Sequence, residues 1–169
     1  TRRGRDLAAP VSRLDLAPEV RNAALPILQA RLSDTLDLQA RLKAAHWNVK
    51  GAQFAALHAL FDQMATEVAS ASDDLAERLV TLGGHADGRP AATAEGSSLP
   101  PWPLVTQGQD VLEALAEAIA THGRALRASI DQAAALGDAG TADLFTGQSR
   151  LTDKQLWQIE AHLADGRAS

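Results

Sequence analysis

The chain has 169 residues and a formal net charge of −5, and 46% of its residues are hydrophobic, 4% aromatic and 22% charged. This profile predicts one compact helical domain and argues against a disordered chain. It contains no run of eighteen apolar residues and no signal-peptide pattern, so we expect a cytoplasmic protein without membrane spans. Because cysteine is absent, a metal site would depend on histidine and carboxylate ligands.

The N-terminal segment is basic, whereas the rest of the chain is acidic. Residues 1–13 carry one aspartate and four arginines, a net +3 that leaves −8 on the remainder; the arginines are Arg2, Arg3, Arg5 and Arg13. Such a tail could bind DNA phosphates by releasing counterions, or it could be an ordinary solvated terminus. We expect a tail over residues 1–17, a helical bundle over residues 18–165 and a short C-terminal tail over residues 166–169.

Two long helices are predicted in the first half of the chain. Apolar spacing indicates a first helix from about residue 18 to residue 49 that stops at Gly51, with Pro26 either kinking it or marking its true first turn. A second helix is expected over residues 53–82, followed by a Gly-Gly stop. Its apolar stripe comprises Phe54, Leu57, Phe61, Met64, Val68, Leu75 and Leu82.

Two further long helices follow a Gly- and Pro-rich connection. Residues 84–106 have room for a short extra helix but not for a long one. A third helix should begin near Thr106, which has capping-box spacing to Gln109, and a fourth should span residues 141–165. The pattern predicts an all-α four-helix bundle in which a long crossover connects the second and third long helices, as in ferritin-like bundles.

The second helix carries two pairs of potential metal ligands. His58 pairs with Asp62 and Asp73 pairs with Glu77, each at a spacing of four residues that places both side chains on one face. The eleven residues between Asp62 and Asp73 bring the second pair back to within roughly 20° of the first. The pair centres are nevertheless about 22 Å apart along the axis, too far for one metal ion.

Two copies of the helix could bring these pairs together. If they pack antiparallel about a two-fold axis, His58 and Asp62 of one copy face Asp73 and Glu77 of the other. His46, at the end of the first helix, can turn toward His58 across the short joint. Two imidazoles and three carboxylates suit iron, manganese or zinc better than magnesium or calcium.

Each residue has an ordinary alternative when it is taken alone. A single histidine is more often a partly buried group with a hydrogen-bond partner than a ligand. Asp73, with Asp74, Glu77 and Arg78, could belong to an exposed helix face that carries a Glu/Asp–Arg pair. Five ligand-type residues on one geometric plan favour the metal site.

Two segments carry a specific resemblance to a known family. KAAHWNVKGAQFAALHALFDQMATEVASASDDLAERLVTLGG, from Lys43 to Gly84, closely resembles the Dps family, the DNA-binding proteins from starved cells, which are small ferritin-like iron proteins. TADLFTGQSRLTDKQLWQIEAHL, from Thr141 to Leu163, is similar to the last helix of that family. The similarity covers most of the chain from about residue 18 to residue 163.

The resemblance implies a hollow homododecamer with a ferroxidase site at each two-fold interface. In the family pattern His46, His58 and Asp62 belong to one subunit, and Asp73 and Glu77 come from its partner. Family members oxidise Fe(II), usually with hydrogen peroxide and otherwise with dioxygen. The ferric mineral that collects in the cavity protects the cell against oxidative damage.

Four further residues are weaker candidates. Lys43, one turn before His46, could pair with Asp73 of the partner subunit, or it could be a surface lysine. Trp47 resembles the tryptophan near the family's iron centre, although a core tryptophan is an alternative. Asp138 and Asp143 resemble the acidic lining of a three-fold pore for iron access, or they complement a helix dipole.

Three classes of function follow from these residues. The leading hypothesis is a ferroxidase that stores iron. The second is a nucleoid-associated DNA-binding protein that acts through its arginine tail, alone or together with iron storage. The third is a purely structural helical bundle, which would leave the five ligand-type residues without a role.

Overall fold

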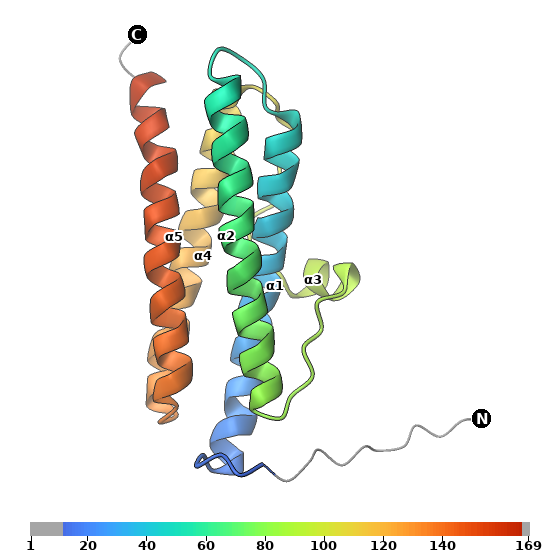
Figure 1. Cartoon of the computed structure of the whole chain (residues 1–169), viewed down its shortest axis with the longest axis vertical. Coiled ribbons are helices and arrows are strands. Elements are labelled where there is room, and N and C mark those ends of the chain that lie inside the picture. The colour runs from blue at the N-terminus through green and yellow to red at the C-terminus, as the bar shows by residue number, and fades with distance from the viewer. Residues whose placement is uncertain (1–11, 167–169) are drawn as a thin grey trace, which may run out of the picture.

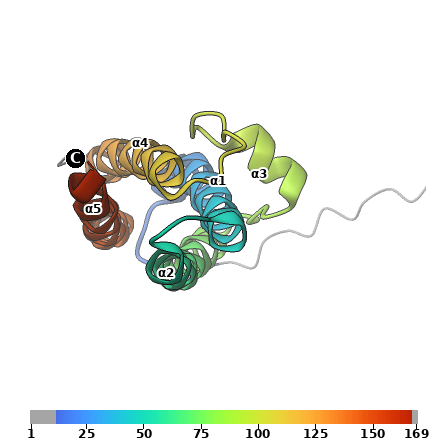
Figure 2. The same ribbon diagram turned by 90° about the horizontal axis from the view of Figure 1, so that it is seen from above.

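The computed structural model describes residues 12–166, which form five helices. These are α1 (Pro18–Asn48), α2 (Phe54–Thr81), α3 (Pro90–Gly96), α4 (Gly108–Ala135) and α5 (Ala139–Gly166). The four long helices run side by side, and the short α3 stands beside α1 (Figure 1). Viewed from above, α1 and α2 form one pair and α4 and α5 form the other (Figure 2). The predicted all-α bundle and its short extra helix are confirmed, and the long helices begin and end within about two residues of their predicted bounds.

The turns between the long helices depend on glycine. Gly51, Gly83 and Gly137 have φ angles of 112°, 97° and 82°, a region that side chains with a Cβ rarely adopt. Each follows a helix end, and the predicted stops at Gly51 and at the Gly-Gly pair after α2 are confirmed. Pro26 lies inside α1, which continues through it, and therefore does not mark the first turn; Pro18 occupies that position.

The predicted capping box at the start of α4 is wrong. The N-cap residue is Gln107, and no side chain caps this helix end. The carbonyl of Thr106 instead accepts a 2.8 Å hydrogen bond from the backbone N–H of Lys50, and Gly108 N–H donates to the carbonyl of Lys50 at 3.1 Å. This short bridge ties the end of the crossover to the turn between α1 and α2.

The interior contains two apolar clusters, one near each end of the bundle. The first includes Leu42, Phe61, Leu115 and Ile159, and the second includes Leu28, Leu75, Leu126 and Phe145. Burial of these side chains is the main force that holds the helices together. None of the helices within residues 12–166 is long and apolar enough to span a bilayer.

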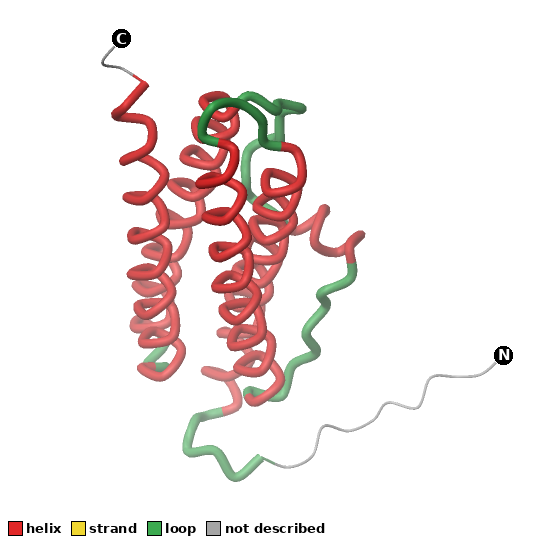
Figure 3. Tube along the Cα trace, turned by 45° about the horizontal axis from the view of Figure 1, so that its top comes forward, coloured by secondary structure: helices red, strands yellow, loops and turns green. Residues whose placement is uncertain are grey.

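The crossover is fastened to α1 by two buried or half-buried carboxylates. Asp34 is fully buried and accepts hydrogen bonds from the backbone N–H and the hydroxyl of Ser98, at 2.6 and 3.0 Å. It also pairs with Arg31 at 2.7 Å. One turn further along, Asp37 accepts a 2.6 Å bond from the hydroxyl of Ser97. These contacts hold the segment after α3 against α1 (Figure 3).

Candidate metal centre

His46 at the end of α1 and His58 near the start of α2 form a stacked pair. Their ring centroids are 3.8 Å apart and their planes differ by 19°. Each Nδ1 lies 2.7 Å from the backbone carbonyl of the other histidine. A carbonyl oxygen only accepts hydrogen bonds, so each neutral ring carries its proton on Nδ1 and keeps a lone pair on Nε2. This is how backbone groups commonly orient metal-binding histidines.

Asp62, one turn beyond His58, is bonded to Lys43. The Lys43 Nζ lies 2.6 Å from Asp62 Oδ1, and both side chains are partly exposed. The hydrogen bond from Lys43 lowers the pKa of Asp62, against a smaller opposing effect of burial, so this carboxyl is ionised at neutral pH. Lys43 also lies 5.9 Å from the ring centroid of Trp47. In a single chain Lys43 thus pairs with Asp62, whereas its expected contact with Asp73 of a second copy stays a prediction.

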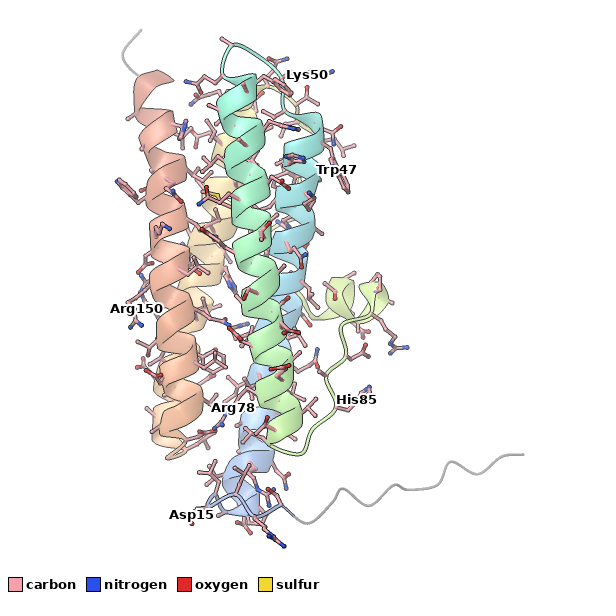
Figure 4. All side chains as sticks on the ribbon, viewed as in Figure 1. Asp15, Trp47, Lys50, Arg78, His85 and Arg150 are labelled. Atoms are coloured by element: carbon pink, nitrogen blue, oxygen red, sulfur yellow. The ribbon has the colours of Figure 1, made fainter. Side chains whose placement is uncertain are left out.

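Asp73 and Glu77 are exposed near the other end of α2. The alternative of an exposed face with a Glu/Asp–Arg pair is right about the exposure but wrong about the partner of Arg78. The Arg78 guanidinium lies between α2 and α5 and bonds to Asp138 at 2.7 Å (Figure 4). Within the described part of one chain, no three or more His, Asp or Glu side chains converge where they could hold a metal ion. One chain therefore presents two separate donor groups.

Two aromatic side chains beside the histidines lie on the surface. Trp47 is 70% exposed, so the alternative of a core tryptophan is wrong (Figure 4). Phe54, expected in the apolar stripe, is 47% exposed, and its ring centroid lies 5.0 Å from that of His58. Sequence reasoning missed this contact, although the four-residue spacing from Phe54 to His58 was the available signal.

The two proposed pore residues differ in position. Asp138 is only 1% exposed and caps α5: its carboxylate accepts bonds from the backbone N–H and hydroxyl of Thr141 and from Arg78. Burial alone would raise the pKa of Asp138, but the bonds from Thr141 and the charge of Arg78 together lower it. The structure thus gives Asp138 the helix-terminal role that was the alternative. Asp143 is exposed, so its side chain is free to line a pore.

The remaining candidates are the arginines of the tail and the other three histidines. Arg2, Arg3 and Arg5 lie outside the described residues, and Arg13 is exposed. The other three histidines lie on α4, on α5 and on the connection after α2. His122 is buried between the two apolar clusters, His162 is half-buried, and His85 lies on the connection after α2 (Figure 4).

Comparison with known proteins places this geometry in a family. A family model described as a ferritin-like domain matches residues 26–169. The DNA protection during starvation protein of Agrobacterium fabrum is 38% identical over 152 residues, which cover 89% of this chain and 94% of that protein. DpsC from Streptomyces coelicolor superposes with a TM-score of 0.87 at 32% identity, covering 92% of this chain and 91% of that chain.

A third similar protein is Dps from Mycobacterium smegmatis in its tetragonal form. Its TM-score is 0.86 at 28% identity, and the match covers 90% of this chain and 94% of that chain. Sequence and fold thus agree along nearly the whole length of the chain. The protein belongs to the Dps family of ferritin-like proteins.

Proposed function

We propose that this protein oxidises Fe(II), preferably with hydrogen peroxide, at sites shared between two copies of the chain. The observation that carries the proposal is the division of donors along α2. His58 and Asp62, joined by His46 from α1, lie at one end, and the exposed Asp73 and Glu77 lie at the other. Each group by itself is an incomplete ligand set for an iron site.

Antiparallel pairing of two α2 helices completes both sets at once. The midpoints of the two donor pairs are at positions 60 and 75. When position 60 of one copy faces position 75 of the other, residues whose numbers add to about 135 lie opposite each other. His58 then faces Glu77 of the second copy, and Asp62 faces its Asp73. The two-fold axis repeats the arrangement, so each pair of chains would hold two such centres.

The donor types suit iron as a substrate. The Nε2 lone pairs of His46 and His58 favour Fe(II), and the carboxylates of Asp62, Asp73 and Glu77 stabilise the harder Fe(III) product. Two Fe(II) ions each give one electron to hydrogen peroxide and become Fe(III). The O–O bond breaks, and the two oxygen atoms take up two protons to give two water molecules. Because both electrons arrive together, no hydroxyl radical is released. Dioxygen is the second oxidant that we propose.

The ferric product would be stored inside a hollow homododecamer. Support comes from family membership and from the relatives' names, which speak of DNA protection during starvation. Asp143 is the better of the two candidates for an iron-access pore because its carboxylate is exposed, whereas that of Asp138 is engaged inside the protein.

The shared site is tested by Fe(II) oxidation under anaerobic conditions with stoichiometric hydrogen peroxide. We expect His58→Ala and Glu77→Ala each to abolish rapid oxidation. Mixing the two variants and reassembling them should restore part of it, because a mixed pair has one intact centre. Asp74→Ala is the matched control, since Asp74 is an exposed carboxylate that lies about 100° around the helix from Asp73. Loss of rate without recovery on mixing would argue for a site within one chain.

DNA binding through the arginine tail is the second candidate function. It is favoured by the net +3 charge of residues 1–13 and by the relatives' names. Twelve tails on one assembly would act together through their high effective concentration. We expect gel retardation of duplex DNA that weakens steeply with salt and disappears when residues 1–13 are removed. Unchanged retardation by the truncated protein would place the contact elsewhere.

A further inference from the structure

The turn that joins the two histidine-bearing helices is bonded to a distant part of the chain, the start of α4. Lys50, in this turn, donates its backbone N–H to the carbonyl of Thr106 at 2.8 Å, and its own carbonyl accepts the N–H of Gly108 at 3.1 Å (Figure 4). Both backbone groups of Lys50 are therefore held by residues more than fifty positions away. A turn such as residues 49–53 can shift between its helices when only its own ends hold it, so these bonds restrict its movement.

The geometry of the histidine pair depends on this turn. His46 lies before it, in the last turn of α1, and His58 lies after it, near the start of α2. Each Nδ1 bonds to the backbone carbonyl of the other histidine at 2.7 Å, so the two bonds span the two helices. Because hydrogen bonds weaken steeply with distance, a shift of about 1 Å between the helix ends would break the pair. Contacts that fix the helix ends therefore also fix the direction of the two Nε2 lone pairs.

The start of α4 also touches α2 directly beside His58. A Cβ atom on Gly108 would lie 3.1 Å from Cδ1 of Leu57, the fully buried residue that precedes His58. It would lie 3.5 Å from the carbonyl oxygen of Lys50. Glycine permits this close approach because it has no side chain. The first residue of α4 thus contacts both the turn and the first turn of α2.

We propose that Gly108 is a positioning residue for the histidine pair. Its N–H holds the carbonyl of Lys50 in the turn, and its bare Cα lets α4 pack against Leu57. Together these contacts keep the end of α1 and the start of α2 at the separation at which the two histidines exchange their bonds. Gly108 acts through the backbone and is not a ligand. The inference rests on the iron site proposed above and adds a residue of α4 that orients two of its donors.

Proline at position 108 removes the hydrogen bond to Lys50 and leaves the helix intact. The first position of a helix tolerates proline, because the N–H there has no partner within the helix. The preceding residue, Gln107, has φ −71° and ψ 135°, the extended conformation that a following proline requires. Gly108→Ala is the matched control, since it also adds a Cβ near Leu57 but keeps the N–H. Comparison of Gly108→Pro with Gly108→Ala separates the hydrogen bond from the crowding.

The first readout is the tautomer of the two rings in the metal-free protein, measured by magic-angle-spinning NMR with ¹⁵N-labelled histidine at about pH 8, where ordinary histidines are neutral. In the native protein both rings should carry their proton on Nδ1, as their carbonyl bonds require. In Gly108→Pro we expect roughly a third or more of each signal to move to the Nε2–H form, whereas Gly108→Ala should keep the native pattern. His46→Gln and His58→Gln assign the signals. His162, whose Nδ1 lies 2.8 Å from the carbonyl of Gln158 within α5, is an internal reference that should not change.

The second readout is the affinity for Zn²⁺, a redox-inactive probe, measured by calorimetry. Gly108→Pro should bind it about 3- to 10-fold more weakly than the native protein, the range that one lost hydrogen bond supplies, and Gly108→Ala should stay within about two-fold. Asp138→Ala is a stability control at the opposite end of the bundle, where it removes the bond to Arg78. It should lower stability without changing the histidine signals or the zinc affinity, so a general loss of stability can be told from a loss of positioning.

The outcomes separate the positioning role from the iron chemistry. Unchanged tautomers in a folded Gly108→Pro protein, verified by circular dichroism, would overturn the proposal, and equal effects of proline and alanine would overturn the role of the hydrogen bond. If Gly108→Pro does not fold, amide hydrogen exchange of the native protein decides: the N–H groups of Lys50 and Gly108 should exchange slowly, and exchange as fast as in an unprotected turn would overturn the proposal. The expected tautomer response in a protein whose native form does not oxidise Fe(II) would support the positioning role while refuting the proposed function.

Discussion

His122 should make the stability of this protein depend on pH. Its side chain is 3% exposed, and its Nδ1 is buried without a hydrogen-bond partner among the described residues. Burial, assisted by the nearby charge of Arg31, lowers the pKa of His122 from its ordinary 6.5 to about 4. The unfolded chain therefore binds this proton more readily than the folded chain, so stability is full above pH 6.5 and falls as the pH drops toward 4.

The expected loss at pH 4.5, relative to pH 7.5, is about 2.5 kcal/mol from this one group. We would measure urea unfolding at both pH values and one protein concentration, because assembly makes stability concentration-dependent. His122→Leu should remove the 2.5 kcal/mol difference while changing stability at pH 7.5 by less than about 1 kcal/mol.

His85→Gln is the control for this experiment, since His85 is exposed on the connection after α2 and should leave the pH dependence as it was. If His122→Leu changed the free energy of unfolding equally at pH 4.5 and pH 7.5, the folded protein would protonate His122 as readily as the unfolded chain does. The reasoning from burial would then be refuted.

Two further predictions concern ion pairs. Lys43→Met should bind Zn²⁺, a redox-inactive probe, roughly two- to five-fold more tightly by calorimetry, because the metal would no longer have to displace Lys43 from Asp62. Unchanged affinity would count against this reasoning. Lys50→Met, at an exposed lysine of the neighbouring turn, is the control. Asp138→Ala should lower the free energy of unfolding by roughly 3 kcal/mol, because it leaves a largely buried arginine unpaired and the start of α5 uncapped. Asp143→Ala should change that free energy by less than about 0.5 kcal/mol in the same urea titration, and equal losses in the two variants would contradict the capping assignment.

Local backbone chemistry made most of the fold predictable. Gly51, Gly83 and Gly137 end helices because of their own conformational freedom, which needs no knowledge of the rest of the chain. The start of α4 was harder to predict because Lys50, more than fifty residues earlier, bonds to both the Thr106 carbonyl and the Gly108 N–H, and α4 begins at Gly108. A contact of that range depends on how helices pack, and a capping motif does not record it.

In the candidate site, too, local features could be predicted from the sequence and contacts between distant residues could not. Helical periodicity was enough to place the donors of α2 on one face, and the short turn after α1 brought His46 to His58 as expected. The partners of Lys43 and Asp138 depend on how α1 sits against α2 and how α2 sits against α5, so sequence spacing could not supply them. The surface position of Phe54 has the same origin, since an apolar stripe wider than the bundle interior leaves one edge outside.

The distribution of charge along α2 selects between the two ways in which a pair of these helices could pack. In a parallel pair, Asp73 and Glu77 would face their own copies, and four carboxylates would be brought together without a counter-charge. In an antiparallel pair each acidic end instead meets the two imidazoles and the Lys43–Asp62 ion pair, and binding of Fe(II) would relieve the repulsion within that end further. The arrangement proposed for iron binding is thus also the one that electrostatics favours, and the arrangement that leaves the donors apart is disfavoured by like charges. Iron oxidation would consequently be confined to correctly paired chains.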